Sequence, residues 1–429
     1  MEKYSEYKDS GIQSIGKIPN HWEVRHLRNF LTLFSEKGFG HSQLLSVTRE
    51  KGVIVRDKEN KEENHNFVPD DLSGYKHLYP GDFVINKMKS WQGSYGVSEY
   101  EGIVSPAYFT CKLKGVNPQF FSLAIRSKAY IGFFMQYSKG IRVDQWDLDP
   151  NSMKDIPFIL PPQNEQLKIV PYLNESLSKI DEAIAQQQKM IDLLNERKQI
   201  IINNAITKGL DSNAPMKDSG VDWIGMIPEH WKVKKLKHTA KTNSGSTPRI
   251  INGKDSPNSN IRWIRTTDLN NDLVTDSSEY LSEKEFKSAS CPWLEKGTIL
   301  ISMYGGTGSF GKLGILAIEA TINQAICSIS CNGSVLSKYM FYYLQAIHPL
   351  WLKFAASSRK DPNLSQDIIR NISTLEPPLK EQELIVANIE TQIRGLNSKA
   401  SDVQRMIALL QERKQIIINE VVTGKVKVS

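Results

Sequence analysis

The sequence contains the same octapeptide twice, and this repeat constrains the fold more than any other feature. ERKQIIIN occupies residues 196–203 and recurs at residues 412–419, 216 positions further along. The flanking residues repeat in the same register, since PPQNEQ at 161–166 matches PPLKEQ at 377–382. A match that keeps its register across both segments indicates a duplicated structural unit rather than chance identity.

A second match marks the start of each half. KDSGIQSIGKIPNHWEVRHL at 8–27 pairs with KDSGVDWIGMIPEHWKVKKL at 217–236, 209 positions further along. The stretches between the matched segments differ in length and share no alignable sequence. The chain is therefore predicted to have two halves, each with a common start, a variable middle and a common helix. The repeated Trp22 and Trp231 are predicted to be packing anchors, because a shared feature is poorly suited to reading different sequences.

The repeated segments after the proline pairs are predicted to be long helices. They are rich in Gln, Glu, Lys, Leu and Ile, which favour helix. Their apolar residues recur about every 3.5 positions beyond four heptads, which is the signature of a coiled coil. The two seams match position by position, so each helix is the simplest partner of the other. The predicted seam residues are Leu173, Leu177, Ile180, Ile184, Ile191, Leu194 and Ile201, and then Ile389, Ile393, Leu396, Val403, Ile407, Leu410 and Ile417.

The repeat alone leaves the direction of the two helices open. A pseudo-twofold axis crossing the pair would make them antiparallel, whereas an axis along the helices would make them parallel. Two amphipathic helices in separate cores would also show apolar periodicity, although the length of the heptad run argues against this alternative. Pro171 has Ala387 as its counterpart, so the first helix is expected to kink at Pro171 or to begin only there.

The variable middles, residues 28–158 and 237–374, are predicted to mix helices and strands. GDFVIN and GTILIS each place a glycine turn before β-branched residues, which indicates a strand, and NPQFFSLAIRS and LSKYMFYYLQAI indicate helices after them. The predicted fold is therefore α+β, with two mixed α/β domains joined by two long helices in a coiled coil and a pseudo-twofold internal repeat. The predicted segments are 1–158, 159–210, 211–375 and 376–429, with the start of the first recurring at 214–236.

Several loops of the variable middles carry side chains suited to DNA contact. Cations bind phosphates, and side-chain amides and hydroxyls can bind base edges. Each of these residue types also occurs in ordinary loops. The predicted DNA-binding residues are Lys87, Lys89, Trp91, Gln92, Arg142 and Gln145 in the first half, and Arg265, Thr266, Tyr304, Lys312, Asn323, Gln324, Arg359 and Lys360 in the second.

No catalytic motif can be identified in the sequence. Gly306, Gly311 and Lys312 fit part of a phosphate-binding loop, but Leu313 stands where Ser or Thr would hold Mg²⁺, and the residues that follow indicate a strand. No methyltransferase motif, glycine fingerprint or metal-ligand constellation is present. A DNA-cleaving or DNA-methylating enzyme is therefore an alternative without a supporting motif.

Composition bounds the class of protein further. No apolar run reaches the ~18 to 20 residues needed to cross a bilayer, and the charged start lacks a signal peptide, so a soluble, cytoplasmic protein is expected. The four cysteines, Cys111, Cys291, Cys327 and Cys331, are expected to be reduced and to bind no metal. A formal charge of +7 is compatible with a polyanionic partner but does not demonstrate one.

Across almost its whole length the chain resembles the specificity subunit of type I restriction-modification systems. The resemblance rests on the paired segments DSGI–IGKIPNHW and DSGVDWIGMIPEHW, on PPQNEQLKIV and PPLKEQELIV, and on the twin ERKQIII helix ends. In the variable middles, YPGDFVINKMKSWQGSYG, GIVSPAYF and GIRVDQWDLDP look like one type of target-recognition domain. WIRTTDL, GTILISMYGGTGSFGKLGI and TINQA look like another.

The resemblance implies a non-catalytic subunit that reads DNA. Each target-recognition domain would read one half of a split, asymmetric sequence. The two helices would form an antiparallel coiled coil that fixes the length of the unread gap. The family's partners would be two modification subunits, which bring S-adenosylmethionine and methylate a flipped adenine, and restriction subunits that use ATP and Mg²⁺. No cofactor would be bound by this chain. A coiled-coil scaffold that binds only proteins, including an inactive orphan subunit, is the remaining alternative.

Overall fold

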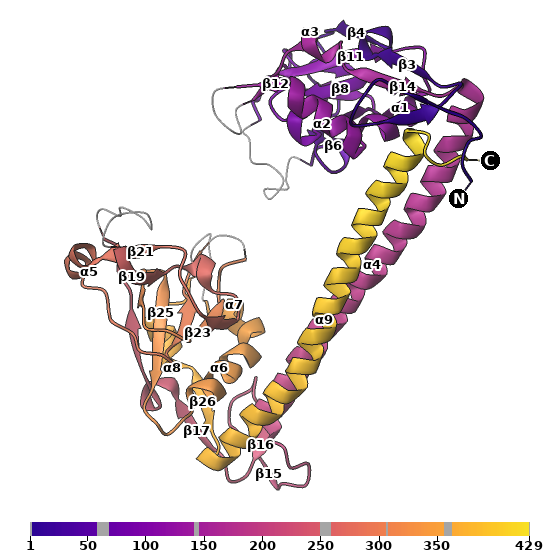
Figure 1. Cartoon of the computed structure of the whole chain (residues 1–429). Helices are drawn as coiled ribbons and strands as arrows, with labels where there is room; N and C mark the ends of the chain where they lie inside the picture. Colours follow the sequence, from indigo (N-terminus) through magenta and orange to yellow (C-terminus); the bar gives the residue numbers. More distant parts are fainter. Residues whose placement is uncertain are drawn as a thin grey trace. The chain divides into compact units, whose positions relative to one another are not determined.

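The computed structural model describes residues 2–57, 68–140, 146–248, 259–305, 308–355 and 363–428. The chain forms two compact units (Figure 1). Unit 1 comprises residues 1–188 together with 404–429, and unit 2 comprises residues 189–403. The boundaries of these units lie inside both long helices, whereas each of the four predicted segments is one continuous stretch of sequence. The two divisions differ in kind, and the four segments therefore stay a prediction.

The main sheet of unit 1 has four antiparallel strands in the order β4-β11-β8-β9. These strands are β4 (Leu31–Phe34), β11 (Tyr108–Leu113), β8 (Phe83–Asn86) and β9 (Tyr95–Val97). Helices α1 (Pro118–Ile125) and α2 (Lys128–Tyr137) supply buried aromatic residues to the core beside this sheet. The strand expected in GDFVIN and the helix expected in NPQFFSLAIRS are therefore confirmed.

Shorter elements complete unit 1. Strand β3 pairs with β14, which joins the start segment to the residues just before the first long helix. These elements are β1 (Tyr7–Asp9), β2 (Lys17–Pro19), β3 (Glu23–His26), η1 (Leu27–Asn29), β5 (Leu45–Thr48), β6 (Gly52–Val55), β7 (Lys76–Leu78), η2 (Ser90–Gln92), β10 (Gly102–Val104), β12 (Ser138–Lys139), β13 (Asp147–Leu148), α3 (Pro150–Met153) and β14 (Pro157–Leu160).

Unit 2 repeats the strand order of unit 1. Its main sheet runs β18-β25-β22-β23-β20, so the first four strands correspond in order to those of unit 1, and β20 is added in parallel to β23. These strands are β18 (Ala240–Ser244), β25 (Ile326–Cys331), β22 (Ile299–Ser302), β23 (Leu313–Leu316) and β20 (Asp272–Val274). The strand in GTILIS and the helix in LSKYMFYYLQAI, α6 (Ser337–Ala346), are confirmed.

The other elements of unit 2 form a second, smaller sheet and the links to the long helices. Strand β19 pairs with β21 and, in parallel, with β24. These elements are β15 (Met216–Asp218), β16 (Met226–Pro228), β17 (Lys232–Lys235), η3 (Leu236–His238), β19 (Ser259–Ile264), η4 (Thr266–Asp268), β21 (Tyr280–Ser282), α5 (Glu283–Ala289), β24 (Thr321–Ile322), η5 (His348–Leu350), α7 (Trp351–Phe354), α8 (Gln366–Asn371) and β26 (Ser373–Glu376).

The two long helices are α4 (Gln163–Lys208) and α9 (Leu379–Val422), and they pair in antiparallel fashion. In the core of unit 1, Leu173 near the start of α4 shares a cluster with Val421 near the end of α9. In the core of unit 2, Ile206 near the end of α4 shares a cluster with Ile385 near the start of α9. The parallel arrangement and the separate-core alternative are therefore wrong, because each core contains both helices.

The expectation that the first helix begins only at Pro171 is wrong. Helix α4 starts at Gln163 and runs through Pro171. Pro171 is exposed, and so is Leu167, whose carbonyl the missing N–H would have bonded. Water can therefore bind the freed carbonyl at this position, which lowers the cost of an internal proline.

Every predicted seam residue is buried or half-buried. In unit 1, Leu177 and Ile184 of α4 and Leu410 of α9 pack against one core. The Lys414 ammonium of α9, at a polar position of the seam, lies 2.6 Å from the Asp181 carboxylate of α4. The burial agrees with a coiled-coil seam, although the role of each single residue stays a prediction.

The twin octapeptides supply equivalent core residues to the two units. Ile202 of α4 is buried in unit 2, and its counterpart Ile418 of α9 is buried in unit 1. After the octapeptide, Ala205 and Ile206 continue into the core of unit 2, and Val421 and Val422 into that of unit 1. Each helix therefore ends in a core that is built from the start segment of the other half of the sequence.

Candidate nucleic-acid interface

The first predicted DNA-contacting loop of unit 1, after β8, contacts residues on either side of segment 141–145. The Lys87 ammonium, just after β8, lies 2.9 Å from the Asp147 carboxylate of β13. The Trp91 ring lies 5.4 Å from that of Trp146, and the Ser90 and Ser138 hydroxyls are 3.2 Å apart. The loop after β8 therefore lies beside Ser138, Trp146 and Asp147, and its contact with DNA stays a prediction.

The conformation of the β8 loop depends on a glycine. Gly93 ends the short helix η2 with a φ of 92°, in the left-handed region that favours glycine. The turn leaves Lys89 exposed and Trp91 and Gln92 half-buried. Arg142 and Gln145, the other two predicted residues of this half, lie outside the described residues.

In unit 2, three strand connections meet and bring most of the predicted residues together. The Asn323 N–H donates to the Ile264 carbonyl (3.1 Å), which precedes Arg265 and Thr266. The Met303 N–H donates to the Ala325 carbonyl (2.8 Å), which places Tyr304 beside Asn323 and Gln324. Arg359 and Lys360 lie outside the described residues.

Lys312 closes the turn that leads from β22 to β23. Its carbonyl accepts a hydrogen bond from the Ser302 N–H at 2.9 Å. Strand β23 begins at the next residue, Leu313, where a phosphate-binding loop would need a helix. The structure thus agrees with the rejection of a nucleotide-binding loop here.

Sequence reasoning missed a fourth connection at this surface. The Thr247 hydroxyl donates a hydrogen bond to the side-chain oxygen of Gln324. The preceding Gly245 lies so close to Ile322 that a Cβ atom would stand 2.1 Å from its carbonyl oxygen, so only glycine fits. The Ser, Gly and Pro residues of SGSTP were the available signal for a tight loop.

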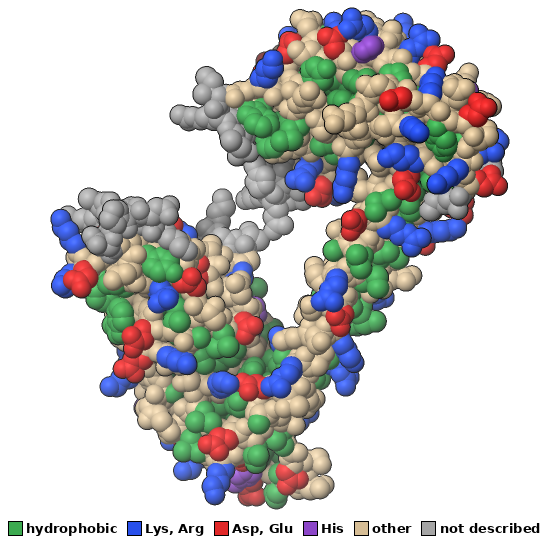
Figure 2. Space-filling model, viewed as in Figure 1, with side chains coloured by type: hydrophobic (Ala, Val, Ile, Leu, Met, Phe, Trp, Pro, Cys, Tyr) green, Lys and Arg blue, Asp and Glu red, His purple; other side chains and the backbone are tan. Residues whose placement is uncertain are grey.

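Three cations at these two surfaces, Lys87, Arg262 and Arg265, are paired with carboxylates. The Arg265 guanidinium donates to the Ser278 hydroxyl (3.0 Å) and lies 3.5 Å from the Glu279 carboxylate, while its Nε is buried without a described partner. The Arg262 guanidinium lies 3.1 Å from Asp276. Lysine and arginine side chains are interspersed with acidic ones over the visible face of both units (Figure 2).

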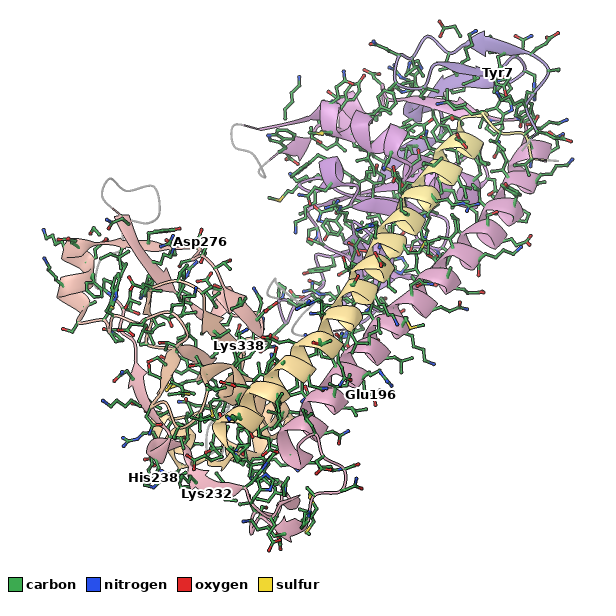
Figure 3. All side chains as sticks on the ribbon, turned by 60° about the horizontal axis from the view of Figure 1, so that its bottom comes forward. Tyr7, Glu196, Lys232, His238, Asp276 and Lys338 are labelled. Carbon is green, nitrogen blue, oxygen red and sulfur yellow. The ribbon has the colours of Figure 1, made fainter. Side chains whose placement is uncertain are left out.

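The carboxyl group of Asp276, the partner of Arg262, has a lowered pKa. Hydrogen bonds from the Tyr280 hydroxyl, the Ser277 backbone N–H and Arg262 lower the pKa of Asp276 to about 2, so its carboxylate is ionised at neutral pH. Asp276 lies at the end of unit 2 opposite Lys232 and His238 (Figure 3). At this end, DNA phosphates would have to compete with a carboxylate for Arg262.

Two classes of site can be checked in the part of the chain that the structure describes. Within it, no three or more His, Cys, Asp or Glu side chains are grouped so as to hold a metal ion. Within the same residues, no helix combines the length and the apolar character needed to cross a membrane. The cysteines lie apart as free thiols, and Cys111, Cys291 and Cys327 are buried.

Comparison with known proteins relates this architecture to one family. Residues 228–402 match a family described as "Type I restriction modification DNA specificity domain". The type I restriction enzyme MjaVIII specificity subunit of Methanocaldococcus jannaschii is 22% identical over 98% of this chain and 97% of its own length. The EcoBI specificity subunit of Escherichia coli is also 22% identical, over 81% of this chain and 74% of its own length.

The chain is therefore similar to type I restriction specificity subunits over almost its whole length, and its residues 228–402 match their DNA specificity domain. A solved structure described as "Structural basis underlying complex assembly and conformational transition of the type I R-M system" has the same fold. It covers 95% of this chain and 99% of its own chain, with a TM-score of 0.65 and 15% identity. This likeness shows the shared fold, and the role of the two units as target-recognition domains stays a prediction.

Proposed function

We propose that this specificity subunit reads a split DNA target, with one half-site read by each recognition domain. The observation that carries the proposal is that the two units share a strand order while the loops at their candidate surfaces differ in sequence and length. Two domains with the same strand order and different loops can contact two half-sites of different sequence. We further propose that the antiparallel helices set the length of the unread gap.

We propose that the chain is not itself an enzyme and acts in the cytoplasm. Its specificity-subunit relatives and the absence of a catalytic motif in the sequence support this assignment. S-adenosylmethionine, ATP and Mg²⁺ would be bound by the modification and restriction subunits of the assembled complex. Incubation of the purified chain with DNA and labelled S-adenosylmethionine should give no incorporation, and incorporation by this chain alone would contradict the assignment.

We propose that two modification subunits dock on a stripe of exposed apolar residues that occurs once on each long helix. Leu193 and Leu409 occupy equivalent positions and are 51% and 54% exposed. Figure 2 shows hydrophobic side chains on the visible face of the long helices. Two identical stripes fit two copies of one partner. The stripe residues are Met190, Leu193 and Ile200 on α4, and Met406, Leu409 and Ile416 on α9.

DNA binding by the assembled complex tests the reading function directly. The complex should bind DNA with an affinity that falls steeply as salt rises, because Lys and Arg contacts to phosphates release counterions. It should also prefer a duplex carrying the target over an unrelated duplex. A complex that assembles but shows neither property would support the protein-binding scaffold instead.

Substitution of Gln92 or Lys87 is expected to change recognition at one half-site only. Both residues lie on the β8 loop of unit 1, and a good base contact is worth about 1 to 3 kcal/mol of discrimination. The measurement is methylation of a library of targets randomised at one half-site at a time. Glu175→Gln, on the exposed side of α4, serves as the control. Equal losses at both half-sites would contradict the prediction.

A further inference from the structure

A glutamate in the first turn of each long helix holds the repeated His-Trp pair. In unit 1, Glu165 accepts hydrogen bonds from the Tyr4 hydroxyl (2.7 Å) and the Trp22 indole N–H (3.0 Å), and it lies 2.5 Å from the His21 imidazole. Trp22 is fully buried, as predicted for a packing anchor. The carboxylate therefore joins the start segment of the chain to the first turn of α4.

Unit 2 contains the same arrangement. Glu381 accepts a hydrogen bond from the Trp231 indole N–H at 3.0 Å and lies 2.7 Å from the His230 imidazole. Trp231 is also fully buried. Tyr4 has no tyrosine counterpart among the hydrogen bonds of Glu381 that the structure describes, so the first junction carries one additional donor.

The next residue of each helix fixes the recognition domain. Gln166 is buried, and its side-chain oxygen accepts from the Asn117 N–H (2.8 Å), which lies at the start of α1. Gln382 is buried as well, and it accepts from the Leu336 N–H (2.8 Å) at the start of α6. One Glu-Gln dipeptide thus links the long helix to the start segment and to a helix of the recognition domain.

The end of the opposite long helix completes each junction. Gly424, after α9, has a φ of +72°, and a Cβ there would lie 2.3 Å from Pro19 and 3.0 Å from Trp22. Gly209, after α4, has a φ of +71°, and a Cβ there would lie 3.2 Å from Trp231. Only glycine allows both this conformation and this approach. Each unit therefore has one junction where both long helices meet the His-Trp segment.

The carboxylate of the first junction is charged at neutral pH. Burial alone would raise the pKa of Glu165, but hydrogen bonds from Tyr4, His21 and Trp22 outweigh burial and lower it. A group with a lowered pKa stabilises the folded state above its ordinary pKa, and this contribution is lost only as the pH falls through the lowered value. The junction therefore holds its charged hydrogen bonds throughout the neutral range.

We propose that Glu165 and Glu381 are positioning residues that fix the direction in which the helix pair leaves each recognition domain, and thereby the length of the unread gap. This inference rests on the proposed function. A helix of 46 residues is about 69 Å long. A change of about 3° in its direction displaces its far end by about 3.4 Å, the rise of one base pair. The gap is therefore sensitive to small changes at the junction.

Methylation mapping of the assembled complex tests the proposal. Glu165→Gln should leave recognition of both half-sites unchanged. It should raise methylation about tenfold at targets whose gap is one base pair longer or shorter than the normal gap. Loss of hydrogen bonds to a charged group is expected to populate a second helix direction to about that extent. Glu381→Gln should act in the same way. Glu175→Gln removes the same charge from the exposed Lys179 pair on α4 and should leave the gap unchanged.

Two further variants separate positioning from stability. Val104→Ala removes buried volume in a cluster that contains no junction residue, so it should lower the Tm without changing the gap. Tyr4→Phe removes a single hydrogen-bond donor and should raise methylation at targets with a wrong gap length by a few fold. This variant tests the proposal if Glu165→Gln does not fold. An unchanged gap in a folded junction variant that still methylates the split target would overturn the positioning role alone. A wild-type complex with no split target would overturn the proposed function as well.

Discussion

Val422→Asp is expected to unfold unit 1 while unit 2 stays folded. Val422 is fully buried at the end of α9, in the core that contains Trp22 and Phe158 of the first half of the sequence. An unpaired carboxylate at this position should cost several kcal/mol, against a typical domain stability of about 5 to 15 kcal/mol. Unit 2 receives only the first part of α9, which the substitution does not touch.

Hydrogen exchange resolved by residue measures this result. Amides of β11 in unit 1 should lose protection, and amides of β25 in unit 2 should keep it. Ile416→Asp, on the same helix at a position that is 47% exposed, is the matched control and should leave both units protected. Retention of full protection in β11 by Val422→Asp would show that the C-terminal residues do not support unit 1.

Leu193→Asp is expected to reduce the number of modification subunits bound to each specificity subunit from two to one. The charge interrupts the apolar stripe on α4 and leaves the equivalent stripe around Leu409 intact. Leu193→Asp combined with Leu409→Asp should bind none. A charge in the centre of a desolvated contact typically costs more than 2 kcal/mol, about thirtyfold in affinity.

Native mass spectrometry of the mixed subunits counts the bound partners. Asn195→Asp introduces the same charge at an exposed position of α4 outside the stripe, and it should still bind two. If both single variants retain two modification subunits, the stripes are not the docking surface.

The repeated sequence predicted most of the architecture because its signals are local. The heptads predicted the long helices, and the glycine turns before GDFVIN and GTILIS predicted strands that occupy equivalent places in the two sheets. The parallel pairing of β20 with β23 was not predictable, because it depends on contacts between distant residues. Pro171 misled the prediction because the helix signal around it outweighs the cost of one exposed proline.

The residues of the candidate interface stay a prediction, and the ion pairs that its cations form could not be predicted from the sequence. The sequence indicated Lys87 and Arg265 as cations, whereas their partners Asp147 and Glu279 come from other segments of the chain. The Glu165 junction shows the same limit. His21, Trp22 and Glu165 each belong to a repeated segment, yet the two segments repeat with different offsets, and only the folded chain shows that they meet.

Genome-wide mapping of adenine methylation tests the reading function most directly. The measurement compares a host that carries this chain and its modification partner with the same host lacking this chain. A split motif with a fixed gap should appear only when the chain is present, with one half-site assigned to each recognition domain. An assembled complex that produces no such motif, or a motif that persists without the chain, would contradict the proposal that this subunit reads the DNA.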